Sequence, residues 1–228
     1  MATKLNQART ARKKGDALRN ANQEERARAA YRAGVAALTD ALRIAAPHEA
    51  LLAAKDLPLE AGHARMLDDL VEIYGALGGI HQRLESPVEA SESYSRGAAL
   101  EERFRHRGTY NRLNAVKSAL LAGTQTLRAS EPQLRALAAV IETQMQESVN
   151  VSDSGWAWAD LGDCLALLGD AEGARRAYAK FISKAETKSP ERTLQVLETI
   201  AAKLRELGDP DVGRLAGAID ALKSRLAV

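Results

Sequence analysis

Residues 156–181, "WAWADLGDCLALLGDAEGARRAYAKF", decide the fold of this chain. Trp158, Leu161 and Leu165 recur at intervals of three and four residues, which places them on one face of a helix. Gly162 has no side chain, so a second helix can approach this region closely. The first half of the stretch therefore predicts a helix that packs against a near neighbour.

The segment "LLGDAEGA", residues 167–174, supplies the turn to that neighbour. Gly169 is suited to end the first helix and Asp170 to cap the second, because glycine often follows helix C-termini and aspartate often precedes N-termini. Ala174 is small and Tyr178 follows it four residues later, on the same face of the second helix. The whole stretch thus predicts two antiparallel helices.

The order of these residues resembles the tetratricopeptide repeat, a 34-residue helix–turn–helix unit with Trp-x2-Leu-Gly in its first helix and Ala-x3-Phe in its second. The small residues and the tyrosine recur twice more along the chain at constant offsets, which are hard to obtain by chance. The three sets are Gly15, Ala27 and Tyr31; Gly78, Ala90 and Tyr94, each 63 residues later; and Gly162, Ala174 and Tyr178, each a further 84 residues later.

We expect an all-α fold, a divergent solenoid of about four to five helical hairpins that forms one domain over residues 1–228. Tyr110 and Asn114 fill the Trp and Gly positions of a further, degenerate repeat. A short helix near 48–56 is expected after Pro47. The repeats are expected near 3–45, 62–104, 109–148 and 154–185, and helices over 190–226 cover the apolar end of the stack.

Polar residues mark the expected helix starts. Ser86 is the expected N-cap of a helix that has Pro87 at its first position. Ser130, Ser189 and Asp209 are the expected N-caps of the helices that follow each of them.

A more specific resemblance covers residues 109–207. Tyr110 and Asn114 form a Tyr-x3-Asn motif, and an apolar helix that ends in Ala122-Gly123 follows it. Then come the leucine-rich "PQLRALAAVIETQMQ", the tryptophan-containing "SDSGWAWADLGDCLALLGD", an alanine-rich helix and the apolar "ERTLQVLETIAAKL". In this order the segment resembles the tetratricopeptide-containing TRAF-binding region of the apoptosis signal-regulating kinases and its bacterial relatives. The resemblance implies a regulatory region that makes protein contacts.

Composition narrows the function classes. The net charge is only +2, so the whole chain carries no polyelectrolyte signal for nucleic acid or membrane. The single cysteine, Cys164, excludes an internal disulfide and fits a reducing compartment. No apolar run reaches the ~18 residues of a membrane helix, and the N-terminus lacks the apolar centre of a secretory signal. We therefore expect a cytoplasmic protein.

No motif points to catalysis or to a metal. The four histidines have no metal-ligand spacing, and His81 takes a tyrosine position of the repeat, where a partly buried packing residue is expected. Cys164 lies near Asp160 and Asp163, which would raise its pKa, so a buried structural thiol is expected rather than a nucleophile. We expect no enzymatic activity, no cofactor and no metal.

The N-terminus is the basic part of the chain. Residues 1–34 carry nine Lys and Arg against three acidic residues, a net charge of +6. Such a segment can be a solvated helix face, a patch for an acidic protein partner, or a nucleic-acid interface. Tyr31 is its only aromatic residue and is assigned to the core, so the solvated face is favoured first and nucleic acid last.

The resemblance to tetratricopeptide repeats implies a groove lined by the first helix of each unit. Trp156 is the sharpest candidate in it, because Trp158 takes the core position and exposed tryptophans often anchor interfaces; packing against an extra turn near 150–154 is the alternative. The predicted groove residues are Arg9, Arg12, Lys13, Asp16 and Arg19; Glu72, Gly75, Ala76, Gly79 and Gln82; Asn111, Arg112, Ala115 and Ser118; and Trp156, Ala159, Asp160, Asp163 and Ala166.

Two functions fit the sequence. The first is a non-catalytic adaptor that binds a partner protein, or another copy of itself, through the repeat surface. The alternative is a regulatory sensor module that binds a small ligand or nucleic acid and controls a separate effector. Retained ligand, or a salt-dependent shift on RNA or DNA, would distinguish the alternative.

Overall fold

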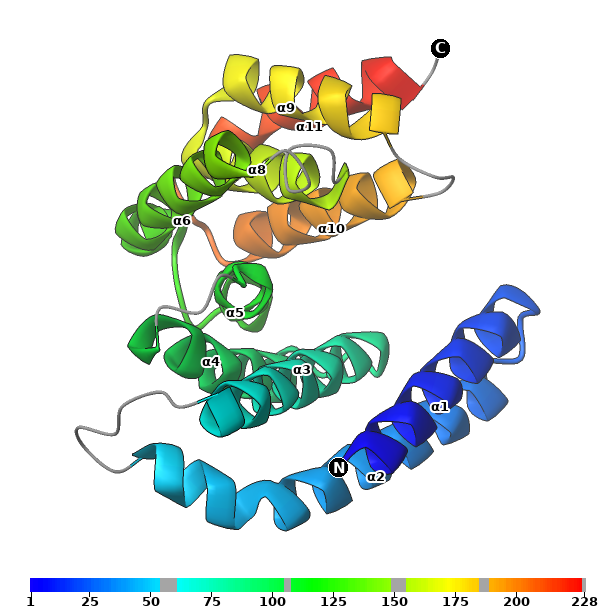
Figure 1. Cartoon of the computed structure of the whole chain (residues 1–228). Coiled ribbons are helices and arrows are strands. Elements are labelled where there is room, and N and C mark those ends of the chain that lie inside the picture. The colour runs from blue at the N-terminus through cyan, green and yellow to red at the C-terminus, as the bar shows by residue number, and fades with distance from the viewer. Residues whose placement is uncertain (54–60, 105–107, 149–154, 185–188, 227–228) are drawn as a thin grey trace. The chain divides into compact units, whose positions relative to one another are not determined.

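The computed structural model describes residues 1–53, 61–104, 108–148, 155–184 and 189–226. Within these ranges the regular structure is helical and no strand occurs, which confirms the all-α fold. The chain divides into two compact units, Met1–Ser118 and Ala119–Val228. Figure 1 labels the helices: α1 Ala2–Asn20, α2 Glu24–Ala53, α3 Ala61–Arg83, α4 Pro87–Arg103, α5 Tyr110–Ala122, α6 Leu127–Glu147, α8 Gly155–Leu168, α9 Ala171–Lys184, α10 Ser189–Glu206 and α11 Arg214–Leu226.

In the first unit, α1 lies along α2, α2 also packs on α3, and α3 packs on α4 (Figure 1). The helix α2 is longer than the sequence predicts. It continues through Pro47 to Ala53, so the separate helix expected near 48–56 is wrong. A proline inside a helix removes one backbone hydrogen bond, but here Leu52 is fully buried against Leu67 and Leu70 of α3. This packing keeps the chain helical beyond the proline.

Glycine–tyrosine contacts recur in three of the helix pairs. In each pair a Cβ atom on the glycine would lie less than 3.0 Å from the tyrosine ring, so only glycine allows the helices to come so close. The correspondence that the sequence offsets predict is therefore a repeated physical contact. The contacts are Gly15–Tyr31 between α1 and α2, Gly78–Tyr94 between α3 and α4, and Gly162–Tyr178 between α8 and α9.

Two of these tyrosines donate a hydrogen bond to the residue that follows the glycine. Tyr31 Oη donates to Asp16 Oδ1 over 2.8 Å, and Tyr178 Oη donates to Asp163 Oδ1 over 2.7 Å. Burial, together with the bond to the carboxylate, raises the pKa of Tyr31 to about 12 and that of Tyr178 well above its ordinary value. Both hydroxyls therefore stay protonated and hold the first helix of the pair against the second.

The middle pair departs from this arrangement because Gly79 stands where the other pairs have aspartate. Tyr94 Oη instead donates to Gln82 Oε1 over 3.2 Å and lies 3.4 Å from the hydroxyl oxygen of Tyr110. The ring of Tyr94 also meets that of Tyr110 edge-on, with 5.8 Å between the centroids. The middle pair is thus joined to the start of α5.

In the second unit, α8 packs on α6 and α9, and α11 packs on α9 and α10. Gly169 has a φ of +83° and Asp170 Oδ1 accepts from the Gly173 amide over 2.8 Å, so the predicted turn between α8 and α9 is confirmed. The N-cap Ser86 and the following Pro87 of the first unit are likewise where the sequence places them.

Two predicted caps are wrong. The helix α6 begins before Ser130, at Leu127, with Thr126 as its N-cap, because Leu127 is buried and belongs to the helix. Asp209 does not cap α11, which begins later, at Arg214. Its Oδ2 instead accepts from the backbone N–H of Leu127 over 3.0 Å, so it caps α6 from 82 residues away.

The boundary between the two compact units falls inside α5, within the predicted third repeat. The three helix pairs with a glycine–tyrosine contact lie on either side of it, α1–α2 and α3–α4 in the first unit and α8–α9 in the second. A continuous solenoid over the whole chain stays a prediction.

Candidate functional site

A hollow of about 510 Å³ lies in the first unit, where α1 and α3 meet the end of α4 and the start of α5. We call it the α1–α3 hollow. Six of the predicted groove positions line it, and they come from three different helices. The lining residues are Arg9, Arg12, Asp68, Val71, Glu72, Gly75, Ala76, Glu101, Gly108, Tyr110 and Asn111.

Charges of both signs line the hollow. Arg9 forms an ion pair with Glu72, so that α1 and α3 are joined across it. Asp68 and the buried Glu101 add two further carboxyl groups, and Arg12 adds the second guanidinium. Because three carboxyl groups accompany two guanidinium groups, the lining has no net positive charge.

The floor of the hollow is a buried polar cluster around Asn111, which is 1% exposed. Its Nδ2 donates to the Val71 carbonyl oxygen over 3.0 Å and to Glu101 Oε1 over 2.9 Å. Because both of these partners are acceptors, the orientation of the Asn111 carboxamide is fixed. Burial raises the pKa of Glu101, although hydrogen bonds from Asn111 and Arg112 oppose the shift.

Glu101 also caps α5. Its carboxylate oxygens accept from the backbone N–H of Asn111 over 3.3 Å and of Arg112 over 3.2 Å. These amides lie in the first turn of α5, where helical backbone donors have no partner within the helix and where negative charge is favoured. The last turn of α4 thus fixes the start of α5, and with it the position of Asn111.

Two buried polar atoms among the lining residues have no hydrogen-bond partner in the part of the chain that the structure describes. They are Nε of Arg12 and Oδ1 of Asn111. A buried donor or acceptor left without a partner costs about 1–3 kcal/mol, so native structures rarely keep one without a reason. One atom is a donor and the other an acceptor.

Gly75 packs closely against the second of these atoms. A Cβ atom at this position would lie 3.0 Å from Asn111 Oδ1 and 3.3 Å from the Tyr110 ring. Any larger residue at position 75 would therefore press on the Asn111 carboxamide.

Other predicted groove residues of the first unit lie outside this lining. Lys13 is exposed. Arg19 pairs with Glu24 over 2.7 Å and donates to the Arg83 carbonyl oxygen, so it holds α1, α2 and α3 together. Gln82 Nε2 lies 3.2 Å from Ser118 Oγ.

Arg112 contributes to the neighbourhood of the hollow without lining it. Its Nη2 donates to the Gly108 carbonyl oxygen over 3.0 Å, and its Nε lies 3.7 Å from Glu101 Oε2. It therefore supports the cap of α5.

The predicted residues of the second unit do not form one site. Asp163 is buried and accepts from Tyr178, so it belongs to the interior, while Asp160 is half-buried. Trp156 is 64% exposed, and its ring centroid lies 6.0 Å from that of Phe181. The extra turn near 150–154, proposed as the alternative partner of Trp156, lies outside the described residues.

Part of the basic N-terminus pairs with acidic side chains of its own unit. Lys4 pairs with Asp40 over 2.9 Å. Arg28 pairs with Glu24 over 3.2 Å and with Glu85 over 2.8 Å. With the Arg9 and Arg19 pairs described above, four of the nine cations in residues 1–34 are paired. Three of their partners, Asp40, Glu72 and Glu85, lie outside this segment and offset half of its +6 charge.

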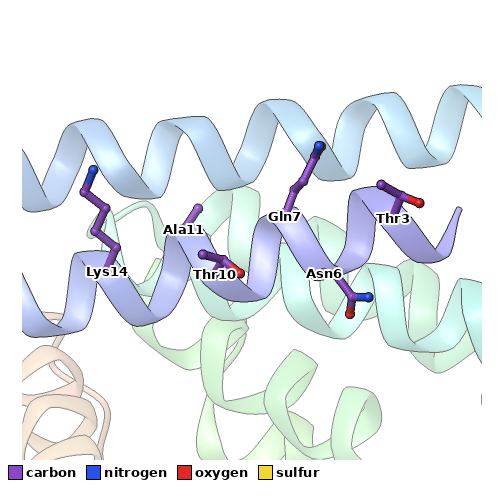
Figure 2. A pocket seen from close by; sticks show the side chains of 6 residues that line it. All are labelled: Thr3, Asn6, Gln7, Thr10, Ala11 and Lys14. Carbon is purple, nitrogen blue, oxygen red and sulfur yellow. The ribbon is translucent and has the colours of Figure 1, made fainter.

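A second hollow, of about 490 Å³, lies along α1 (Figure 2). All six side chains that line it come from this one helix, and Lys14 is the only charged one. None of the predicted groove residues is among them. The lining residues are Thr3, Asn6, Gln7, Thr10, Ala11 and Lys14.

Cys164 and His81, the cysteine and the histidine considered as reactive groups, are both at least half-buried. Cys164 is a buried thiol, as expected. His81 is half-buried, and burial lowers its pKa. Among the described residues, no three His, Cys, Asp or Glu side chains are grouped so that they could hold a metal ion.

None of the helices in the described ranges is long and apolar enough to cross a membrane.

Sequence reasoning missed Glu101, Asp68 and Tyr110 as lining residues. Glu101-Glu102 looks like an ordinary solvated acidic pair, and the two residues do separate, since Glu101 is buried and Glu102 exposed. Its position in the sequence could have indicated this role. Glu101 lies near the end of one expected helix, ten residues before Asn111, so its side chain can reach the first turn of the next helix.

No protein-family model and no curated protein matches this chain. The relationship to tetratricopeptide proteins, and to the TRAF-binding region of the apoptosis signal-regulating kinases, therefore stays a prediction that rests on the residues quoted above.

Proposed function

We propose that this chain is a non-catalytic adaptor that binds a segment of a partner protein in the α1–α3 hollow. The supporting observation is that predicted groove positions from α1, α3 and α5, far apart in the sequence, line the same hollow. Arg12 is half-buried and lines the hollow together with Arg9 of the same helix. Tyr110 is 50% exposed and adds an aromatic side wall.

The charges that line the hollow limit the charge of the partner segment that can enter it. With as many acidic as basic groups or more, the hollow attracts no strongly acidic segment. An acidic partner segment would instead meet exposed cations such as Lys13 and Lys14.

Selection of peptides from a random display library on the purified chain tests this function. We expect one family of related peptides to be enriched and to bind the chain in solution. The comparison uses two charge reversals on α1, Arg12→Glu and Lys13→Glu, which change the net charge equally. Only Arg12 lines the hollow.

We expect the selected peptides to bind at least 10-fold more weakly to the Arg12→Glu chain and to keep their affinity for Lys13→Glu. Circular dichroism confirms that both variants remain helical. Absence of any enriched family, or equal loss in both variants, would rule out the hollow as the binding surface.

The sensor function is the second candidate, and one observation favours it. The volume of about 510 Å³ lies within the range of small-ligand sites, roughly 300–1,000 Å³. Native mass spectrometry of the chain purified without denaturation tests it. A retained small molecule, lost in Arg12→Glu, would favour the sensor over the adaptor.

A further inference from the structure

The side of α2 opposite its buried residues Tyr31, Leu38 and Ala45 is its outer face, and it is apolar over most of its length. Ile44 is 50% exposed and Leu51 is 40% exposed, although both are large apolar side chains. The face of a surface helix that points away from the core normally carries charged and polar residues. The outer face of α2 is therefore suited to contact with another protein surface.

A seam of six positions runs along the outer face. These positions recur at alternating intervals of three and four residues, the heptad spacing that keeps one stripe of a helix against a second helix. Five of the side chains are exposed and Asp40 is half-buried. The seam positions are Ala33, Ala36, Asp40, Arg43, Pro47 and Ala50.

The two charged residues at the centre of the seam point to a second copy of the chain as its partner. Two α2 helices that lie antiparallel, about a two-fold axis between positions 41 and 42, place Asp40 of each copy opposite Arg43 of the other. The same register places Ala36 opposite Pro47 and Ala33 opposite Ala50. Each position of the seam thus meets a residue of matching character.

Other arrangements of two α2 helices lack this complementarity. A parallel pair in register would place Asp40 against Asp40 and Arg43 against Arg43, and like charges repel. An antiparallel pair shifted by seven residues would leave each charged group against an alanine or a proline. Charged and polar residues in such a seam select register and orientation in this way. The side chains of Arg43 and Asp40 are 79% and 37% exposed, so both can reach a second helix.

We propose that the chain forms an antiparallel homodimer through the outer face of α2, in which Asp40 of each copy pairs with Arg43 of the other. Ile44 and Leu51 directly follow the seam positions Arg43 and Ala50, so a second helix on the seam covers these exposed side chains. No residue of α2 lines the α1–α3 hollow. A dimeric adaptor therefore carries two hollows, and a partner with two binding segments gains affinity by avidity.

Light scattering of the purified full chain over a range of concentrations tests the dimer. One helix pair is a small interface, so we expect the mass to rise with concentration from that of one chain to that of two. Ala36→Glu places a carboxylate in the seam and should leave only monomer. Ala99→Glu adds the same charge at an exposed alanine of α4, outside the seam, and should leave the association unchanged. Circular dichroism confirms that both variants remain helical.

A charge exchange tests the proposed pairing itself. Asp40→Arg brings arginine against Arg43 of the second copy, and Arg43→Asp brings aspartate against Asp40, so each variant should be monomeric alone. An equal mixture of the two variants restores both opposite-charge pairs and should form a dimer with one chain of each kind. Loss of folding cannot produce this recovery. A monomer at every concentration, a dimer that persists in Ala36→Glu or Asp40→Arg, or a mixture that stays monomeric would overturn the proposal.

Discussion

Gly78 and Gly79 are neighbours in α3, and the structure predicts opposite effects when each is replaced by alanine. A Cβ on Gly78 would lie 2.7 Å from three ring atoms of Tyr94, whereas a Cβ on Gly79 would meet its nearest neighbour at 3.5 Å, an ordinary contact. Tyr94 cannot easily move away. It is fully buried, and its hydroxyl and ring contact Gln82 and Tyr110.

Two opposing effects, helix propensity and overpacking, determine how each substitution changes the free energy of unfolding. Alanine inside a helix is favoured over glycine by about 0.8–1.0 kcal/mol. Overpacking a well-packed interior costs typically about 1–3 kcal/mol, and occasionally more. Gly79→Ala should therefore stabilise the chain by up to about 1 kcal/mol, because only the first term acts. Gly78→Ala should destabilise it by up to about 2 kcal/mol, because the overpacking cost is larger than the gain in helix propensity.

Urea unfolding followed by circular dichroism measures both variants, with the slope m as the check that the folded and unfolded states are unchanged. The difference in unfolding free energy between the two variants should be about 1–3 kcal/mol, because the helix-propensity gain is common to both and only the overpacking cost remains. Equal stability of Gly78→Ala and Gly79→Ala would show that the ring of Tyr94 yields, and would refute the view that close glycine–tyrosine contact fixes these helix pairs.

Three further predictions concern the buried polar groups. Tyr178→Phe removes the donor to Asp163 and should lower the unfolding free energy by about 1.5–3 kcal/mol. Tyr31→Phe should lower it less, because Asp16 keeps its ion pair with Arg83. Urea unfolding measures both variants, and a larger loss for Tyr31→Phe would contradict this prediction. Asp209→Ala leaves Thr126 as N-cap but removes the acceptor of the Leu127 N–H in the first turn of α6, and it should lower the unfolding free energy by about 1–2 kcal/mol in urea unfolding. Asp209→Asn keeps an accepting oxygen and should recover most of this loss; no recovery would speak against a capping role. The pKa of Glu101 is raised in the folded state, so its stabilisation is present below its ordinary pKa of about 4.5 and is lost as pH rises through the folded pKa. The unfolding free energy of Glu101→Gln minus that of the parent should therefore increase from pH 4 to pH 7, and a decrease would mean that the carboxylate is favoured on folding.

Much of the fold could be predicted because glycine, alanine and tyrosine positions report close helix contacts directly. Gly15, Gly78 and Gly162 each meet their tyrosine where the offsets require it. The extension of α2 through Pro47 could not be predicted, since it depends on the burial of Leu52 against another helix. From the local sequence alone a proline predicts the end of a helix, but tertiary packing can override this preference.

The candidate site was predicted only in part, for a related reason. Arg12, Glu72 and Asn111 follow from the position of groove residues on first helices. Glu101 could not be found by that rule, because it lies at the end of a second helix and acts across a chain reversal. Asp209 shows the same limit, since its partner Leu127 is 82 residues away and no local pattern connects them.

A chemical-shift map of the ¹⁵N-labelled chain, titrated with a selected peptide, tests the central claim most directly. If the α1–α3 hollow is the binding surface, the largest saturable shifts occur at Gly75, Gly108, Asn111 and the Arg12 side chain, all of which line it. If the largest shifts instead gather in α8 and α9 around the exposed Trp156, with the hollow signals unchanged, the claim is contradicted and the second unit carries the interaction.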